Sequence, residues 1–190
     1  MTLGLVRLKL EEHKLLDATK LVTCEAGDVI QAGKFSVEFI HANHSIADAV
    51  SFAIKCPVGV VIHTGDLRLT PPPSRGRSWT DPPGPAGQGR GPALLCDSTN
   101  VERPGFTKSE RSVGDSFDAL FRGCQQRIIV TTFASNVDRI QQIIDVAARY
   151  GRKVAVTGRS MENAMKVSTE LGYMNIPDGV LMDLNQIKSL

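Results

Sequence analysis

A histidine and an aspartate each follow an apolar segment of the sequence, beside small residues. His44 lies in the stretch HANHSIADAV (41–50), and Asp66 lies in VVIHTGDLRL (60–69). A histidine and a carboxylate at the ends of neighbouring strands can present metal ligands on the rigid edge of a sheet. The alternative is structural, because a histidine can cap a turn and an aspartate after Gly65 can close an Asx-turn. These two stretches therefore predict either a metal site or two ordinary turns.

The elements before and between these residues favour short strands. The segments KLVTCEAG, FSVEFIH, AVSFAIKC and GVVIHTG are rich in Val, Ile and Phe and are separated by Gly, Pro and Asn. This pattern is typical of β-strands. Residues 5–16 precede them with the spacing of an amphipathic helix. His44 and Asp66 are therefore both predicted near strand ends.

From about residue 107 the pattern changes to an alternation of strand and helix. RIIVTTF is followed by SNVDRIQQIIDVAARYG, and KVAVTG is followed by RSMENAMKVSTELG. This alternation indicates parallel βαβ units. Gly151 and Gly172 fall where left-handed residues end helices. Two pairs have the spacing of a helix-start capping box, namely Thr107 with Glu110 and Ser135 with Asp138.

Composition and charge limit the functional classes. The chain has 190 residues, of which 42% are hydrophobic and 22% charged, and its net charge is only +2. Bulk charge therefore gives no argument for nucleic-acid binding. No apolar run reaches the roughly 18 residues of a membrane span, and charged residues interrupt the first helix, unlike a signal peptide. The four widely separated cysteines favour buried thiols over disulfides. We therefore expect a cytoplasmic protein without a membrane segment.

Residues 71–92, PPPSRGRSWTDPPGPAGQGRGP, separate the two halves. They hold seven of the ten prolines, five glycines and the single tryptophan. This composition predicts neither helix nor strand. The segment is expected to be a disordered linker, or to result from compensating frameshifts in a GC-rich gene.

The order of several motifs resembles bacterial ribonuclease J, a nuclease of the metallo-β-lactamase fold and the β-CASP group. The motifs are HSIADAV, GVVIHTGD, ALLCDSTNVERPGFTKSER, TTFASNVDRIQQII and YGRKVAVTGRSMENAMKVSTELGY. The resemblance covers nearly all of the chain apart from residues 70–92. It implies an α/β fold in which a partial metallo-β-lactamase αββα sandwich is followed by part of a β-CASP parallel α/β domain. The implied divisions are 1–69 for the first part, 70–92 for the irregular segment, 93–106 for the end of the first part, and 107–190 for the partial β-CASP domain.

The resemblance also implies roles for individual residues. His44 matches the family's third metal-binding motif, a ligand of one zinc, and Asp66 matches the fourth, which bridges two zincs. A bridging carboxylate suits two cations that share an activated water. His63 fits a supporting role better than a ligand role. Asp97 matches the first β-CASP motif, whose carboxylate works with a later histidine that protonates the leaving oxygen; an Asx-turn or a helix cap is the alternative.

Two strand-to-helix turns are the expected contacts with RNA phosphates. Helix N-termini offer free N–H groups and partial positive charge. The side chains expected to add donors there are Ser135, Asn136, Arg159 and Ser160. Both serines are also suitable as plain helix caps. Asp138 departs from the family, in which a histidine usually follows this stretch, and its negative charge weakens the local assignment.

Several family motifs are missing from the chain. The His-x-His-x-Asp-His motif and the two later histidine motifs do not occur, and the only histidines are His13, His41, His44 and His63. A catalytic zinc needs about three protein ligands, so the two zincs of a complete family site cannot be held. We therefore expect an internal piece of a ribonuclease J that is inactive alone, and the resemblance implies homo-oligomers for full-length members.

The implied function is zinc-dependent hydrolysis of RNA phosphodiester bonds, by endonuclease and 5′-to-3′ exonuclease modes, in RNA maturation and decay. Two alternatives remain open: a non-catalytic fragment that binds RNA or mediates assembly, and a β-CASP nuclease that acts on DNA. A small-molecule hydrolase of the metallo-β-lactamase fold is disfavoured, because it would lack the βαβ half at residues 127–172.

Overall fold

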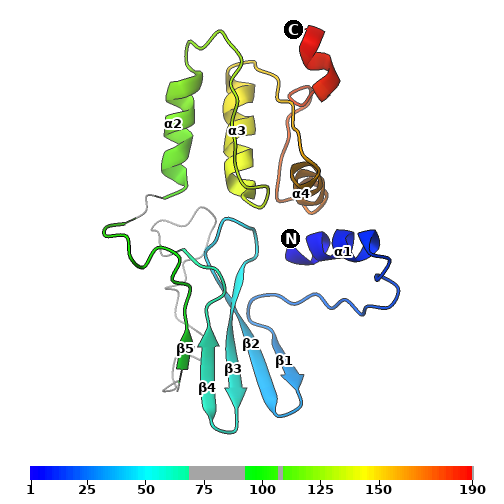
Figure 1. Cartoon of the computed structure of the whole chain (residues 1–190), viewed down its shortest axis with the longest axis vertical. Helices are drawn as coiled ribbons and strands as arrows, with labels where there is room; N and C mark the ends of the chain where they lie inside the picture. The colour runs from blue at the N-terminus through cyan, green and yellow to red at the C-terminus, as the bar shows by residue number, and fades with distance from the viewer. Residues whose placement is uncertain (69–92, 107–108, 190) are drawn as a thin grey trace. The chain divides into compact units, whose positions relative to one another are not determined.

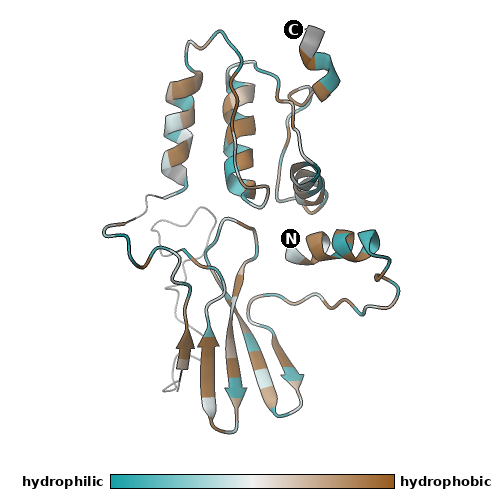
Figure 2. Cartoon of the chain, viewed as in Figure 1, coloured by the Kyte–Doolittle hydropathy of each residue, from teal (hydrophilic) through white to brown (hydrophobic). Residues whose placement is uncertain are grey.

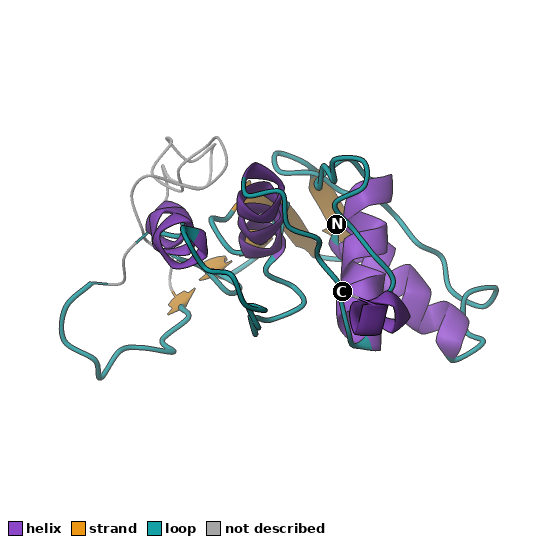
Figure 3. Cartoon of the chain, turned by 90° about the horizontal axis from the view of Figure 1, so that it is seen from above, coloured by secondary structure: helices purple, strands orange, loops and turns teal. Residues whose placement is uncertain are grey.

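The computed structural model describes residues 1–68, 93–106 and 109–189. The described chain forms two compact units. Unit 1 comprises Met1–Ala18, Ser45–Ala47 and Glu110–Leu190, and unit 2 comprises Thr19–His44 and Asp48–Ser109. Within the described residues there are four α-helices and five strands (Figure 3). The fold is therefore mixed α/β.

Unit 2 is built on one five-stranded sheet. Its strands are β1 (Val29–Ala32), β2 (Phe35–His41), β3 (Val50–Cys56), β4 (Gly59–His63) and β5 (Ala93–Leu95). They lie side by side in this order (Figure 1). The first four strands are antiparallel neighbours, whereas β5 is parallel to β4. The strands predicted within FSVEFIH, AVSFAIKC and GVVIHTG are confirmed.

Side-chain pairs across β2 and β3 explain why these strands adopt this register. Phe39 lies opposite Phe52, and the two rings meet edge to face with centroids 5.2 Å apart. Glu38 lies opposite the fully buried Ala53, and its Oε2 forms an ion pair with Lys55 Nζ at 3.3 Å. Cross-strand aromatic pairs and opposite charges stabilise a sheet. Figure 2 shows that β4 and β5 consist mainly of apolar residues.

All the described helices belong to unit 1. They are α1 (Thr2–Glu12), α2 (Arg111–Phe121), α3 (Val137–Arg149), α4 (Arg159–Glu170) and the short 3-10 helix η2 (Leu184–Ser189). One apolar cluster includes Ile140 and Ile144 of α3 and Met165 of α4. A second cluster packs Phe117 and Phe121 of α2 against the other side of α3. None of the helices in the described ranges is long and apolar enough to cross a membrane.

The helix ends agree only in part with the capping predictions. Gly151 and Gly172 have φ of 63° and 75°, so both are left-handed residues after helices, as predicted. The N-cap of α3 is Asn136 and not Ser135, because Asn136 Oδ1 accepts a hydrogen bond from Arg139 N at 3.1 Å. The N-cap of α4 is Gly158, so Ser160 lies inside the helix. Thr107 of the other predicted capping box lies outside the described residues.

The first helix begins and ends earlier than the predicted 5–16. It covers residues 2–12, and the chain turns away at Lys14, whose φ is 57°. A left-handed residue cannot continue a right-handed helix. The amide of Leu15 bonds instead to the carbonyl of Leu10 at 2.8 Å, which closes the helix end.

Three predicted strands do not form. KLVTCEAG contributes no strand, and its end forms a turn in which the Glu25 amide donates to Asp28 Oδ2 at 2.7 Å and the Asp28 amide donates to the Glu25 carbonyl at 3.0 Å. RIIVTTF and KVAVTG form no ladder, and a single parallel bridge joins Val154 to Leu181. A strand is defined by pairing with a neighbour, so apolar alternation alone does not produce one.

The side chains of RIIVTTF nevertheless alternate between a packed face and an exposed face. Ile128 and Val130 pack against the α2–α3 cluster. Ile129 and Phe133 point away and are 90% and 81% exposed. One face of this extended segment is therefore covered, and the other is apolar and exposed.

The predicted disorder of residues 71–92 concerns a stretch outside the described residues.

Candidate functional site

The predicted metal ligands and the predicted catalytic aspartate lie just after the ends of strands in unit 2. His44 follows β2, Asp66 follows β4, and Asp97 follows β5. Because β4 and β5 are adjacent and parallel, the aspartates that follow them lie at the same edge of the sheet. The sequence prediction that these residues follow strands is therefore confirmed, whereas the ligand roles of His44 and Asp66 and the catalytic role of Asp97 stay predictions.

The turns that carry His44 and Asp66 are joined by a pair of hydrogen bonds. The Arg68 amide donates to the Asn43 carbonyl at 2.7 Å. In return, Asn43 Nδ2 donates to the Arg68 carbonyl at 3.2 Å. This reciprocal pair holds the residue before His44 beside the segment that follows Asp66. Sequence reasoning missed Asn43, although it stands next to His44 in the same motif.

Two histidines of this region have a ring nitrogen without a protein partner among the described residues. They are His41 and His44, whose Nδ1 atoms are both buried. A buried polar atom without a partner is rare and needs an explanation such as an ion, a ligand or water. This observation supports a ligand role for His44. His41 was not singled out from the sequence, although it lies in the same HANHS stretch.

The Asp97 carboxylate closes its own turn and also contacts the segment that contains Asp66. Its Oδ1 accepts hydrogen bonds from the Thr99 hydroxyl at 2.7 Å and the Thr99 amide at 3.0 Å. Its Oδ2 accepts from the Leu67 amide at 3.4 Å. Hydrogen bonds from the Thr99 hydroxyl and amide, and then from the Leu67 amide, hold the pKa of Asp97 below its usual value. The Asx-turn considered from the sequence is present, and the same carboxylate also contacts the neighbouring turn.

His63 stabilises its own turn. Its Nδ1 accepts a hydrogen bond from the Gly65 amide at 3.0 Å. This contact agrees with the expected supporting role. The exposed Asp66 lies just beyond this turn.

The described residues do not complete a zinc site. Among residues 1–68, 93–106 and 109–189, no group of three or more His, Cys, Asp or Glu side chains is arranged to hold a metal ion. A catalytic zinc requires about three protein ligands. His44 and Asp66 could therefore supply only part of a ligand set, and no catalytic step through a metal follows from this chain. The four cysteines are free thiols, as predicted, but the prediction that they are buried was wrong, because Cys96 is exposed and the other three are partly exposed.

The expected phosphate contacts lie in unit 1. Arg159 begins α4, is 82% exposed, and forms an ion pair with Glu12 of α1 at 3.1 Å. Ser135 and Ser160 are exposed. Asn136 is 2% exposed and caps α3. Arg159 is therefore the long, exposed cation of this set, whereas Asn136 has a structural role in the helix.

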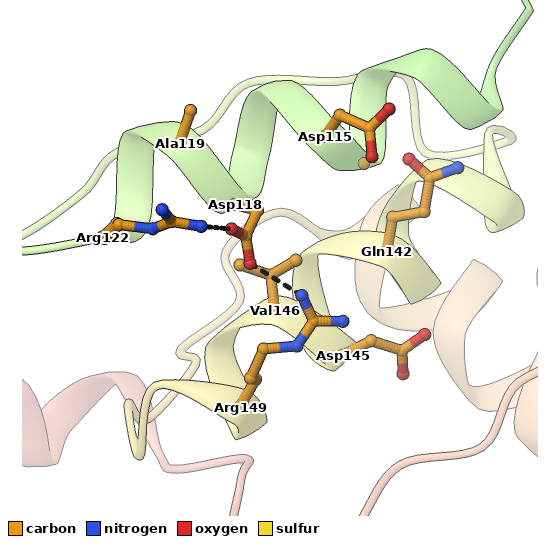
Figure 4. A pocket seen from close by; sticks show the side chains of 9 residues that line it. Asp115, Asp118, Ala119, Arg122, Gln142, Asp145, Val146 and Arg149 are labelled. Atoms are coloured by element: carbon orange, nitrogen blue, oxygen red, sulfur yellow. Dashed lines mark hydrogen bonds and ion pairs between the residues drawn. The ribbon is translucent and has the colours of Figure 1, made fainter.

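An open pocket of about 680 Å³ lies between α2 and α3 of unit 1. At its centre, Asp118 accepts bonds from Arg122 Nη2 at 2.8 Å and Arg149 Nη1 at 2.7 Å (Figure 4). None of the residues predicted to act in metal or RNA binding lines it. Its lining consists of Gly114, Asp115, Asp118, Ala119, Arg122, Gln142, Asp145, Val146 and Arg149. The pair of Asp118 with Arg149 joins α2 to α3, whereas Arg122 lies four residues after Asp118 in the same part of the chain.

Comparison with known proteins shows that the chain is similar to ribonucleases J. Ribonuclease J of Mycolicibacterium smegmatis is 44% identical over 185 residues, which cover 96% of this chain and 33% of that protein. Ribonuclease J of Synechocystis is 41% identical over 192 residues, which cover 100% and 30%. Ribonuclease J of Thermus thermophilus is 40% identical over 193 residues, which cover 100% and 34%. The chain thus spans about a third of the length of these relatives.

A solved structure supports the fold. The crystal structure of a protein of unknown function from Enterococcus faecalis V583 is similar with a TM-score of 0.59 and 16% identity, over 88% of this chain and 42% of that one. Residues 125–190 match the family described as ribonuclease J, beta-CASP domain. This match and the relatives at about 40% identity show that the chain is similar to ribonuclease J along nearly its whole length.

Proposed function

We propose that this chain is part of a zinc-dependent ribonuclease of the ribonuclease J type, which cleaves RNA phosphodiester bonds in endonuclease and 5′-to-3′ exonuclease modes during RNA maturation and decay. The observation that carries the proposal is the identity of about 40% to several ribonucleases J along nearly the whole chain. We further propose that it acts in the cytoplasm and that full-length members form homo-oligomers.

The proposed architecture follows the same relationship. The sheet of unit 2 is part of a metallo-β-lactamase αββα sandwich, and residues 107–190 are part of a β-CASP parallel α/β domain. The parallel bridge between Val154 and Leu181 supports the parallel arrangement. The exposed apolar face at Ile129 and Phe133 agrees with a sheet that further elements complete.

In this proposal His44 and Asp66 are two ligands of the zinc centre, and residues outside this chain supply the others. Bound zinc would activate a water molecule for attack on phosphorus. The chain's own contribution is geometric, because the Asn43–Arg68 bonds hold the two ligand turns together. Asp97, as an ionised carboxylate with a lowered pKa, suits the role of acceptor that orients a general acid and not the role of acid itself.

Contacts with RNA phosphates are assigned to Arg159, with Ser135, Asn136 and Ser160 at the two helix starts. Arg159 has the exposure and charge for such a contact. The nearby Glu12 would compete with a phosphate for the same guanidinium, so binding would exchange one partner for the other. Each phosphate contact by a basic side chain adds to the salt dependence of binding.

A non-catalytic RNA-binding or assembly fragment is the second candidate function. It is favoured by the incomplete metal ligand set among the described residues. It needs only the surface of unit 1. A β-CASP nuclease acting on DNA has less support, since the relatives are named as ribonucleases.

One experiment on the 190-residue chain tests RNA against DNA as the bound nucleic acid and tests the expected inactivity of the chain alone. The chain is incubated with 5′-monophosphorylated RNA and with DNA of the same sequence, with and without added zinc, and cleavage and binding are measured. We expect RNA binding without cleavage, about one unit of salt slope lost in Arg159→Ala, and no loss in Arg7→Ala, another exposed arginine of unit 1. Zinc-dependent cleavage would contradict the expected inactivity of the chain alone, and stronger binding to DNA would contradict the RNA assignment.

A further inference from the structure

We propose that Thr64 is a positioning residue that holds the Asp97 turn against the Asp66 turn. This inference rests on the proposed function, because it assumes that the two aspartates act in one site. Thr64 lies between β4 and the turn that contains Asp66, and it is 2% exposed. A polar side chain at a buried position normally forms a specific hydrogen bond.

Thr64 contacts the end of β5 twice. Its amide donates to the Leu95 carbonyl at 3.0 Å, which extends the parallel pairing of β4 and β5 by one bond. Its hydroxyl oxygen accepts a hydrogen bond from the Asp97 amide at 2.9 Å. These two bonds fix the backbone on both sides of Cys96, and so fix the point from which the Asp97 side chain leaves the sheet.

The hydroxyl of Thr64 also acts as a donor within its own turn. Oγ1 donates to the Gly65 carbonyl at 2.8 Å. The same oxygen therefore joins the Asp97 amide to the peptide that precedes Asp66. The other link between these turns, from the Leu67 amide to Asp97 Oδ2, is longer at 3.4 Å. Thr64 thus supplies the shorter of the two side-chain bonds that join the turns.

Residues of β3 hold Thr64 from the opposite side. The fully buried Ser51 donates from Oγ to the Thr64 carbonyl at 2.6 Å. Gly65 has φ of 62°, and a Cβ at this position would lie 2.9 Å from the Val50 carbonyl oxygen. The turn therefore packs tightly on β3, and Thr64 has little freedom to move. A residue whose own position is fixed in this way can position others.

The test compares hydrogen exchange of single amides in the full 190-residue chain by NMR. Thr64→Val keeps the shape of the side chain but removes the hydroxyl, whereas Thr64→Ser keeps the hydroxyl. We expect Thr64→Val to speed exchange of the Asp97 and Leu67 amides at least tenfold and Thr64→Ser to restore their protection. Amides of the β1–β2 hairpin, such as that of Val37, should change less than twofold.

Two results would overturn the proposal: unchanged exchange at Asp97 and Leu67 in Thr64→Val, or an equal loss of protection in the hairpin, which indicates general destabilisation. If Thr64→Val does not fold, Ser51→Ala serves instead, because it releases the Thr64 carbonyl and leaves the hydroxyl in place. In Ser51→Ala, a loss of protection at the Asp97 and Leu67 amides of less than tenfold supports the proposal, and no loss contradicts it. The measurement needs neither metal nor RNA, so a failure of RNA binding would contradict the proposed function alone.

Discussion

Arg139 of α3 binds Glu110, the N-cap residue of α2, through three short contacts. Nη2 lies 2.7 Å from Oε1 and 2.9 Å from Oε2, and Nε lies 3.2 Å from Oε2. Glu110 is buried, and its carbonyl also accepts a bond from Gln142 at 3.1 Å. This forked pair therefore joins the beginning of α2 to the first turn of α3.

Replacing Arg139 by alanine is expected to destabilise unit 1, because it leaves the buried Glu110 carboxylate without its main partner. The expected loss is about 2 kcal/mol in the free energy of unfolding. Urea unfolding followed by circular dichroism at 222 nm measures it, since all the described helices lie in unit 1. Lys166→Ala is the control, because its pair with Glu170 is exposed and 4.0 Å long and should contribute under about 0.5 kcal/mol. Equal effects of the two substitutions would contradict this role of Arg139.

The stability of unit 1 should fall in acid through Asp118. Hydrogen bonds from Arg122, then Arg149 and Tyr150, lower the pKa of this carboxyl from its ordinary value of 3.8. A lowered folded-state pKa means that the stabilisation is complete above the ordinary value and is lost as pH falls through the folded value. The difference in urea midpoint between the unmodified chain and Asp118→Asn should therefore be constant above about pH 5 and should shrink towards pH 2.5. A difference as large at pH 2.5 as at pH 5 would refute the assignment, and Asp115→Asn controls for charge loss on the same helix.

Gly65 should tolerate alanine less well than Gly33, although both have φ of 62°. A Cβ on Gly33 meets nothing within 4 Å, whereas one on Gly65 lies 2.9 Å from the Val50 carbonyl oxygen. We expect Gly33→Ala to cost about 1 kcal/mol from backbone strain and Gly65→Ala about 2 kcal/mol more from overpacking. Hydrogen exchange of the β1 and β2 amides measures the cost at Gly33, and that of the β3 and β4 amides measures the cost at Gly65. Similar exchange in the two variants would show that the approach of Val50 has no energetic consequence.

Gly4 should be required where α1 crosses α4. A Cβ on Gly4 would lie 2.6 Å from Val167 Cγ1. Gly4→Ala is therefore expected to destabilise unit 1 by about 1–3 kcal/mol, although alanine favours helix more than glycine does. Val167→Ala should recover part of that loss when combined with Gly4→Ala. A double-mutant cycle measured by urea unfolding checks this coupling, and additive effects would contradict the close contact.

Local patterns predicted the elements that position the candidate site. The strands β2, β3 and β4 are consecutive in the chain and pair with one another as antiparallel neighbours. Such strands need only short turns between them, so a local sequence pattern is enough to predict them. α3 and α4 also follow from their amphipathic spacing, and Gly151 and Gly172 mark their ends. The spacing of motifs placed His44, Asp66 and Asp97 after strands.

The helix start at α3 shows the limit of such patterns. Ser135 and Asn136 are both good N-cap residues, and the sequence alone does not rank them. In the folded chain Val137 is buried in the apolar cluster, so the helix begins there and Asn136 is left at the capping position.

The sequence by itself determined the similarity to ribonuclease J, the strands β2, β3 and β4, the helices α3 and α4, and the residue types available for metal and phosphate chemistry, because these depend on local spacing and on similarity to relatives. Only the tertiary structure decided which of them meet. The bonds from Thr64 to Asp97 and from Asn43 to Arg68 join residues 33 and 25 positions apart, so they exist only after the strands have paired. The same reason explains why RIIVTTF and KVAVTG form no ladder here: pairing is a property of neighbours in space and not of the segment alone.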